Sequence, residues 1–493
     1  MRVFARVAVG LVLVLLLVAA AVAMNTWRQS SRQMVVTPAP ALAFDESAAA
    51  RRLGEAVAIR SISFSPAFPP ATEEFRKLHA LLEASFPRTH AALKRETVGG
   101  LSLLYTWPGT DTGAKPAMLM AHQDVVPIAP GTEGDWTVLP FSGEIHDGFV
   151  WGRGAWDDKG NLMAIMEAVE LLVGQGFRPR QTLYLAFGHD EELGGRNGAA
   201  AIAQLLASRG VRLDFVLDEG LLITHGVLKG LDRPLALIGV AEKGFLTLEL
   251  TATGEPGHSS MPPPQTVIGS LSGALARLEA DPAPAELTEV TRATLATIAP
   301  EMPPLNRAMM SNLWLFGPLV RRELEKSASS NALLRTTAAL TFVQAGEKEN
   351  VLPGRAQALV NYRMLPGDTA AAVIERARRL VGPDIRVEAR AGASEASPVS
   401  PLTSAGYRAI ERSIREVFPD TVVAPGLMVG GTDARHMLAL SDNVYRFAPV
   451  RAQPQDLARF HGTNERVSVA NYAEMVRFFH RLIGNLDAVA NAR

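Results

Sequence analysis

Histidines and carboxylates follow several apolar runs of this sequence, and in combination these residue types can hold metal ions. The residues that end or follow such runs are His122, the triplet Asp190-Glu191-Glu192, and Asp218. The chain has no cysteine, so a metal ion can bind only through nitrogen and oxygen ligands. With His461, the set comprises two imidazoles and at least three carboxylates. Two metal ions that share one carboxylate require such a set, and such centres catalyse hydrolysis.

The spacing within each motif suggests a division of roles. His122 and Asp124 lie two positions apart, so in an extended strand they share a face, and Asp124 could orient the imidazole. A surface histidine beside a solvated aspartate is the alternative. The glycine-rich segment 152–160 precedes a predicted helix, where Asp157 and Asp158 could either bind metal or cap that helix.

Three adjacent carboxylates after a buried strand are costly without a cation. Neighbours in extended chain point to opposite sides, so one of Glu191 and Glu192 can bind metal while the other faces the attacking water. The alternative is an acidic surface loop. Taken singly, Asp218 and His461 are weak signals. Zinc suits a mixture of imidazole and carboxylate ligands, while cobalt and manganese remain open.

The elements that position these residues alternate between strand and helix from residue 44 to about 240. This pattern predicts an α/β fold with a mostly parallel sheet, in which ligands bind at the carboxyl ends of the strands. The pattern of predicted strands and helices changes over residues 241–392. The new pattern predicts an inserted α+β, ferredoxin-like lid or dimerisation domain. The α/β pattern returns over 393–493. Residues 279–330 contain six prolines and are expected to be irregular, with no assigned place or role.

The N-terminus carries an apolar run over 7–24 without any charged residue. About 20 such residues span a membrane, so residues 1–28 are expected to form a single anchor, followed by a linker over 29–43. A cleaved secretory signal is the alternative, because Ala21-Val22-Ala23 has a small-x-small cleavage pattern. Both interpretations export the catalytic part. The 49 basic and 50 acidic residues give no overall charge that would attract nucleic acid.

These motifs, in this order, resemble the dizinc metallopeptidases of family M20, which include aminoacylase and vacuolar carboxypeptidase S. Within the family, the chain is most similar to the carboxypeptidase S and N-fatty-acyl-amino-acid synthase/hydrolase branch. The resemblance implies that Asp157 bridges two zinc ions, that His122 and Asp218 bind one ion, and that Glu192 and His461 bind the other. Glu191 is then the general base. Trp156 departs from the family pattern, in which a smaller or aliphatic residue is expected.

The resemblance extends to the lid. It implies that His258 reaches the scissile carbonyl. It also implies that Asn331, Arg363, Gly430 and Gly431 hold the substrate, with the arginine pairing with a free carboxylate. In dimeric relatives this histidine serves the partner's site. A homodimer therefore remains open here, because the segment 279–330 could block pairing.

The sequence thus predicts an exported, membrane-anchored amide hydrolase acting next to a free carboxylate in small peptides or N-acyl amino acids. Its expected cofactors are two zinc ions. The alternative is a metal-free, non-catalytic binding protein on the same fold. A serine hydrolase is disfavoured because no Gly-x-Ser-x-Gly sequence occurs.

Overall fold

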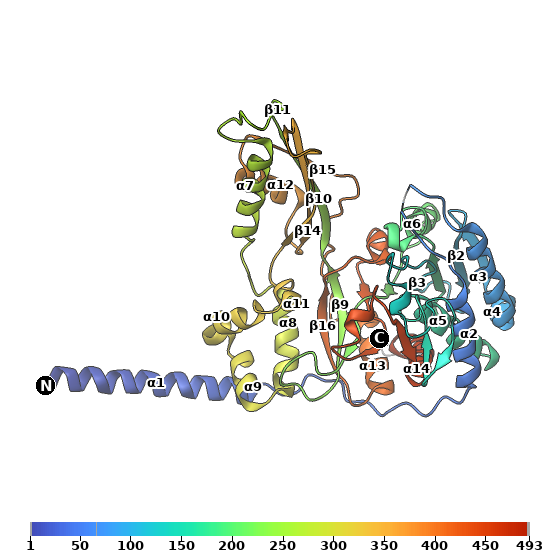
Figure 1. Cartoon of the computed structure of the whole chain (residues 1–493). Helices are drawn as coiled ribbons and strands as arrows, with labels where there is room; N and C mark the ends of the chain where they lie inside the picture. The colour runs from blue at the N-terminus through green and yellow to red at the C-terminus, as the bar shows by residue number, and fades with distance from the viewer. Residues whose placement is uncertain (1, 66, 491–493) are drawn as a thin grey trace.

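A mixed ten-stranded sheet forms the centre of the larger domain in this computed structural model, which describes residues 2–65 and 67–490. The strand order is β1-β2-β6-β3-β7-β17-β9-β8-β18, with β16 also paired to β9 (Figure 1). The strands are β1 (Lys94–Val98), β2 (Ser102–Trp107), β3 (Ala117–His122), β6 (Leu183–Gly188), β7 (Phe215–Asp218), β8 (Ile223–Thr224), β9 (Leu235–Glu242), β16 (Val422–Met428), β17 (Val444–Arg446) and β18 (Arg451–Ala452). The neighbours β6, β3, β7 and β17 run parallel, so their carboxyl ends share one edge.

Helices cover both faces of this sheet. On one face, the largest apolar core contains Leu119 of β3 together with residues of the four helices α2 (Glu46–Ala58), α5 (Lys159–Gly174), α13 (Ala405–Val417) and α14 (Val469–Ala490). On the other face, Met118 and Met120 pack with α6 (Ala199–Ser208). Alternate residues of a strand face opposite sides, so residues 117–121 of β3 are all apolar because both sides are covered. The predicted α/β class is confirmed.

A small sheet, β19-β5-β4, joins two loops that carry predicted site residues. Its strands are β4 (Ile145–His146), β5 (Phe149–Trp151) and β19 (Arg466–Ser468). Arg466 pairs with Trp151 in an antiparallel register. The pairing therefore fixes the end of β5 and the start of β19 next to each other, and with them the two loops that they join.

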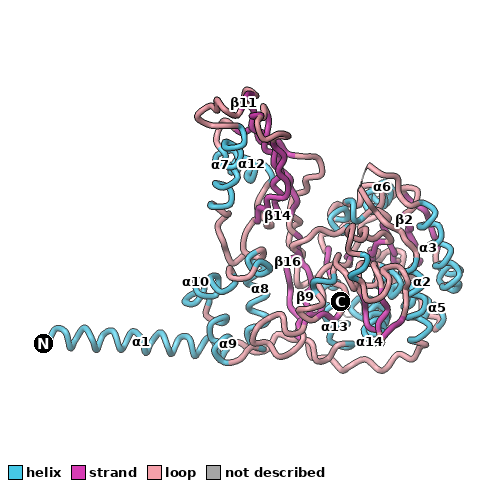
Figure 2. Tube along the Cα trace, in the orientation of Figure 1, coloured by secondary structure: helices cyan, strands magenta, loops and turns pink. Residues whose placement is uncertain are grey.

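The lid is a four-stranded antiparallel sheet in the order β12-β14-β10-β15, with two helices on one face. Its elements are β10 (Gly244–Thr253), α7 (Val267–Ala280), β12 (Thr337–Ala345), β14 (Arg355–Met364), α12 (Ala370–Val381) and β15 (Ile385–Ala389). This order is ferredoxin-like, as predicted. Only Lys243 separates β10 from β9, so the lid sheet extends directly from the main sheet (Figure 2).

The proline-rich segment within 279–330 is helical rather than irregular. It forms α8 (Glu289–Ile298), α9 (Pro304–Ser311), α10 (Leu313–Leu324) and the short α11 (Ala328–Asn331). Pro304 occupies the first turn of α9, where a missing N–H costs nothing. Leu295 and Val320 pack with Val422 and Ala424 of β16, so α8 and α10 share a core with the main sheet. The expectation of an irregular segment was wrong because Pro304 starts a helix and Pro318 lies on an exposed helix face, while Pro282 and Pro284 lie in the stretch before α8.

The N-terminal helix α1 (Arg2–Arg28) projects away from the rest of the molecule (Figure 1). None of its residues is buried, and in the described part of the chain it is the one helix long and apolar enough to cross a membrane. Residues 29–45 form no helix or strand, but they are fixed to the surface. Gln33 donates to the Val423 carbonyl and accepts from its N–H, and the Ala39 N–H donates to the Glu416 carbonyl.

Candidate metal centre

The predicted ligands gather at the carboxyl edge of the parallel strands. His122 ends β3, the Asp190-Glu191-Glu192 triplet follows β6, and Asp218 ends β7. Asp157 lies in the glycine-rich turn between β5 and α5, and His461 lies in the loop that precedes β19. Because β6, β3 and β7 are parallel neighbours, residues distant in sequence meet at this edge.

Asp157 lies between the two histidines. His122 Nε2 is 2.9 Å from its Oδ1, and His461 Nε2 is 2.8 Å from its Oδ2. Burial alone would raise the pKa of Asp157, but the hydrogen bonds from the two imidazoles bring it below the ordinary range. A carboxylate that presents one oxygen to each of two imidazoles has the arrangement expected of a bridging ligand.

Glu192 completes the His461 side of this group. Its Oε1 is 3.4 Å from His461 Nε2, and this buried oxygen has no hydrogen-bond partner among the described residues. Burial raises the pKa of Glu192, and the charge of Asp157 raises it further. A buried carboxylate oxygen without a donor is an observation that fits a cation ligand.

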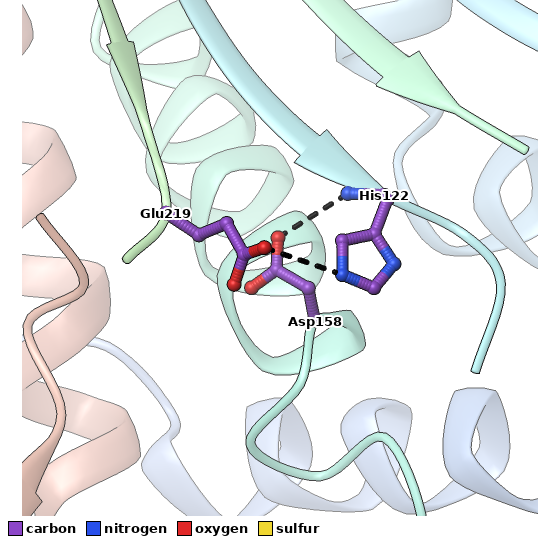
Figure 3. Close-up of side chains that lie close together, drawn as sticks. All are labelled: His122, Asp158 and Glu219. Atoms are coloured by element: carbon purple, nitrogen blue, oxygen red, sulfur yellow. Dashed lines mark hydrogen bonds and ion pairs between the residues drawn. The ribbon is translucent and has the colours of Figure 1, made fainter. Parts of the chain in front are cut away.

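Two further carboxylates, those of Glu219 and Asp158, also approach His122 (Figure 3). Glu219 Oε1 lies 3.6 Å from His122 Nε2, and Asp158 Oδ2 accepts the His122 backbone N–H at 3.2 Å. Burial raises the pKa of Glu219 to about 7. The predicted ligand Asp218 instead accepts the backbone N–H groups of Ala434 and Glu219, at 2.7 and 3.0 Å.

Asp124 connects the histidine to the acidic triplet. His122 Nδ1 is 2.9 Å from the Asp124 backbone carbonyl and 3.4 Å from its Oδ1. The carboxylate of Asp124 accepts the backbone N–H groups of Glu191 and Glu192, each at 3.2 Å. Asp124 thus contacts the imidazole through both its carbonyl and its carboxylate, and it also fixes the turn that carries the predicted general base.

Glu191 is half-buried and lies beside other acids. Burial raises the pKa of Glu191 well above its ordinary value; the charges of Asp433 and Glu219 raise it further, while His122 opposes them. Asp433 is itself 3% exposed, and neither of its carboxylate oxygens has a hydrogen-bond partner among the described residues. So many buried acids in one place require compensating positive charge, and the donor set of imidazole and carboxylate fits metal ions.

A buried ion pair holds the two ligand-bearing loops together. Arg153 donates to Glu465 and to the carbonyl groups of His461 and Gly462. Glu465 also accepts the backbone N–H of Asp157 at 3.1 Å. The positions of Asp157 and His461 are therefore set by one shared pair of side chains.

The predicted substrate residues lie where the lid joins the main domain, with one exception. Arg363 on β14 stacks over the Phe245 ring at 4.9 Å, and burial together with the charge of Arg435 lowers its pKa. A Cβ added at Gly431 would lie 2.7 Å from Arg435 Nη1, so this glycine leaves room for that guanidinium.

Asn331 and Gly430 are also near this junction. Asn331 ends α11, and the carbonyl of the next residue, Ala332, accepts a hydrogen bond from buried Lys243 at 2.9 Å. Gly430 is half-buried beside Met428. His258 is the exception, because β11 (Gly257–His258) is exposed at the outer end of the lid (Figure 1).

Several residues of the centre were not predicted from the sequence. They are Arg153, Glu219, Asp433, Arg435 and Glu465. Each stands within or beside a motif that was recognised for another residue. These residues could have been found from the sequence because each is charged and lies in a segment expected to be buried. A buried charge needs a partner of opposite charge or a metal ion.

The comparisons agree with this geometry. The sequence profile described as Peptidase family M20/M25/M40 matches residues 118–485. The chain belongs to peptidase family M20. A probable carboxypeptidase S-like protein of Dictyostelium discoideum is 41% identical, over 89% of this chain and 85% of its own. An N-fatty-acyl-amino acid synthase/hydrolase of Danio rerio is 43% identical, over 88% of this chain and 84% of its own.

Two solved structures share this fold. An M20 family metallo-carboxypeptidase of Sulfolobus solfataricus superposes with a TM-score of 0.65 at 18% identity, covering 90% of this chain and all of the other. Human carnosine dipeptidase 1 gives a TM-score of 0.64 at 17% identity, covering 90% of this chain and 96% of the other. The M20 chain is a metal-dependent amide hydrolase, as predicted, and the non-catalytic alternative is not favoured.

Proposed function

We propose that this M20 enzyme uses two zinc ions to hydrolyse an amide bond next to a free carboxylate, in small peptides or N-acyl amino acids. The position of Asp157 between His122 and His461 carries the proposal, because each carboxylate oxygen faces one imidazole at 2.8–2.9 Å. The printed names of the relatives, carboxypeptidase S-like and N-fatty-acyl-amino acid synthase/hydrolase, support this substrate class.

One ion would be held by His122, by Asp157 and by a carboxylate of the Asp218-Glu219 pair. The other would be held by Asp157, Glu192 and His461. Zinc held there would supply a Lewis acid that polarises the scissile carbonyl and would lower the pKa of a water to about 7. Metal content of Asp218→Asn and Glu219→Gln variants, measured by mass spectrometry, identifies which of the two acids is the ligand.

Glu191 is proposed as the general base. It would take the proton of the attacking water and then pass it to the leaving amine. Glu191 is half-buried, and its backbone N–H donates to Asp124 at 3.2 Å, so its backbone position is fixed. Asp124 also contacts the His122 ring, which makes it a positioning residue for both the base and the ligand.

Arg363 and Arg435 are proposed to bind the substrate carboxylate together, beside Asn331, Gly430 and Gly431. No carboxylate lies within ion-pair distance of either guanidinium in the described part of the chain, and their mutual repulsion contributes to the lowered pKa of Arg363. An anionic group placed between them would relieve this repulsion and accept charge-assisted hydrogen bonds.

We further propose that the enzyme acts as a homodimer in which His258 stabilises the oxyanion in the partner's site. Two observations support this. His258 is exposed on the lid, away from the metal centre of its own chain. The edge strand β12 exposes Phe342 and Val343, by 48% and 58%, and an exposed apolar edge strand is suited to pairing with a second sheet.

We also propose that α1 spans the membrane as an uncleaved anchor and that the catalytic part is exported. With about 1.5 Å per residue, its 27 residues extend about 40 Å, more than the roughly 30 Å of a bilayer core. Immunoblotting of membrane and soluble fractions distinguishes this anchor from a cleaved signal by the size and location of the product.

The substrate proposal is tested by assaying purified, zinc-loaded enzyme on matched N-acyl amino acids, dipeptides and their carboxyl esters. Hydrolysis of the free acids, loss of activity with chelator and recovery on adding zinc are the expected results. Equal rates on acids and esters would contradict the carboxylate requirement, and activity that survives complete metal removal would contradict the metal requirement.

A further inference from the structure

The helix α10 has an apolar outer face that no other part of the described chain covers. Trp314, Leu315 and Leu319 on this face are 58%, 40% and 53% exposed, and Pro318 is exposed beside them. These positions are spaced as i, i+1, i+4 and i+5, so they form one continuous ridge along the helix. Single exposed apolar residues are ordinary, but a ridge of four on one helix face marks an interaction surface.

The inner face of α10 packs against the main domain. Val320 is buried against Val422 and Ala424 of β16, and Phe316 packs on the same cluster. The helix is therefore apolar on both sides, and its fold in this chain is explained by the inner side alone. The outer ridge requires a separate explanation.

The end of α1 is attached to this same region. Asn312, at the start of α10 and fully buried, donates to the Val22 carbonyl at 3.3 Å and to Thr26 Oγ1 at 3.1 Å. Arg307 on α9 donates to the Thr26 carbonyl at 3.3 Å and to the Gln29 carbonyl at 2.7 Å. These contacts hold α10 at a fixed position along α1.

That position corresponds to the surface of a bilayer. About 20 residues of helix cross the hydrocarbon core, so a span that begins at Val7, after the charged Arg6, ends near Thr26. Trp27, in the last turn of α1, is 80% exposed, and tryptophan is enriched at the boundary between membrane and water. Trp314 on α10 belongs to the segment that is hydrogen-bonded to this turn, so both indoles lie at one end of the span.

We propose that the outer ridge of α10 lies in the headgroup region of the lipid bilayer and holds the catalytic part against the membrane surface. This inference rests on the proposed membrane anchor. The ridge would insert its apolar side chains shallowly, as amphipathic helices do when they lie in the interface plane. Arg321 and Arg322 follow the ridge, and their long side chains could extend to lipid phosphates.

The absence of cysteine from the sequence permits a direct test. Single variants Trp314→Cys, Leu319→Cys, Leu15→Cys and Lys77→Cys of the full-length protein each carry one environment-sensitive fluorophore. They are reconstituted into vesicles of phosphatidylcholine and phosphatidylglycerol. Lys77 is the matched control, because its side chain on α3 (Thr72–Ser85) is 64% exposed and belongs to a different part of the fold. The mutated side chains are exposed, and retained hydrolase activity reports that each variant is folded.

The expected result is a blue shift and strong quenching by nitroxide-labelled lipid at positions 314 and 319, with neither effect at 77. Labels at 314 and 319 that respond like the label at 77, while position 15 is quenched by lipid, would overturn the inference and leave the anchor intact. Protection from aqueous iodide without quenching by lipid would show that a protein, such as a second copy, covers the ridge, and would also overturn it. Absence of lipid quenching at position 15 would overturn the anchor itself.

Discussion

Arg153 donates a hydrogen bond of 2.5 Å to Glu465, and these two side chains are only 2% and 0% exposed. They join the loop of the bridging aspartate to the loop of the second histidine. Glu465 accepts the N–H groups of Gly154, Trp156 and Asp157, while the guanidinium donates to the His461 carbonyl. The pair makes no direct contact with a metal ligand's coordinating atom, but it sets the separation between two of the ligands.

Replacing Glu465 by glutamine should therefore damage the centre without removing a ligand. Zinc affinity is expected to fall about 10- to 100-fold, as for other outer residues that orient metal ligands. The free energy of unfolding should fall by about 3–5 kcal/mol, because Arg153 would be left as a buried, uncompensated charge. Competition with a fluorescent chelator and denaturant titration measure the two effects. The exposed pair Glu73–Arg76 provides the control, since Glu73→Gln should change neither quantity.

Glu191→Gln is expected to retain both zinc ions and to lower kcat by about 10²- to 10⁴-fold, the usual contribution of a general base. Metal analysis and steady-state kinetics on the same preparation test this. Asp190→Asn in the same triplet is the matched control. Asp190 accepts the backbone N–H groups of Asn197 and Gly198 at 2.8 Å, so its loss should lower stability while the folded enzyme keeps its kcat. Wild-type turnover in Glu191→Gln would remove the residue from its assigned role.

Arg363→Ala and Arg435→Ala should each lower kcat/KM for a free-acid substrate by about 10- to 100-fold, the effect of losing a hydrogen bond to a charged group. Their activity on the corresponding methyl ester should change little, because the ester has no charge to bind. The ratio of acid to ester activity is the diagnostic measurement. Arg379→Ala, an exposed arginine on the lid helix α12, should leave that ratio unchanged. An unchanged ratio in Arg435→Ala would leave Arg363 as the sole anchor.

Chelated enzyme should lose stability as the pH rises. Hydrogen bonds to Asp157 and then Glu192 raise the pKa of His461 to about 10, above the value of about 6.5 expected in the unfolded chain. A raised pKa contributes stability in full below about pH 6.5, and this contribution is lost as the pH rises through about 10. Urea titrations of the chelated protein across this range should show the decline. His461→Asn should flatten it, and a wild-type curve that rises with pH would contradict the assignment.

Mixing two inactive variants tests the proposed dimer. His258→Ala lacks the lid histidine and Glu191→Gln lacks the base, so each alone should be nearly inactive. In a mixed dimer, the intact base of one copy meets the intact histidine of the other, and one of the two sites should recover. Activity should appear after unfolding and refolding the two variants together, but not after refolding each one alone. No recovery, despite mixed dimers seen by differential tagging, would place His258 on its own chain's site.

The sequence predicted most elements because their patterns are local. The run 117–121 is a strand ending at His122, and the final helix follows its apolar spacing. The segment 279–330 could not be placed, because its helices are specified by contacts with β16, a strand about a hundred residues away in the chain. The prolines do not exclude helices here, because α9 begins at Pro304 and α10 continues through Pro318.

The candidate site divides in the same way. His122, Asp157, Glu192 and His461 stand in recognisable motifs and lie together in the structure. Which of Asp218 and Glu219 binds metal could not be predicted from the sequence. It depends on which of the two carboxylates already accepts hydrogen bonds from backbone N–H groups. Arg435 was not predicted as a substrate-binding residue. Its role depends on Arg363, which belongs to the lid, and no sequence pattern indicates that the two domains meet there.

The fixed course of residues 29–45 affects how the enzyme would meet its substrates. A flexible linker would let the catalytic domain rotate freely relative to the membrane anchor. Here Gln33 and Ala39 are hydrogen-bonded along the surface, so the domain and α1 should turn as one body. The metal centre would then keep a constant orientation relative to the plane in which the protein diffuses. Amphiphilic molecules moving laterally in that plane would encounter it at one preferred angle.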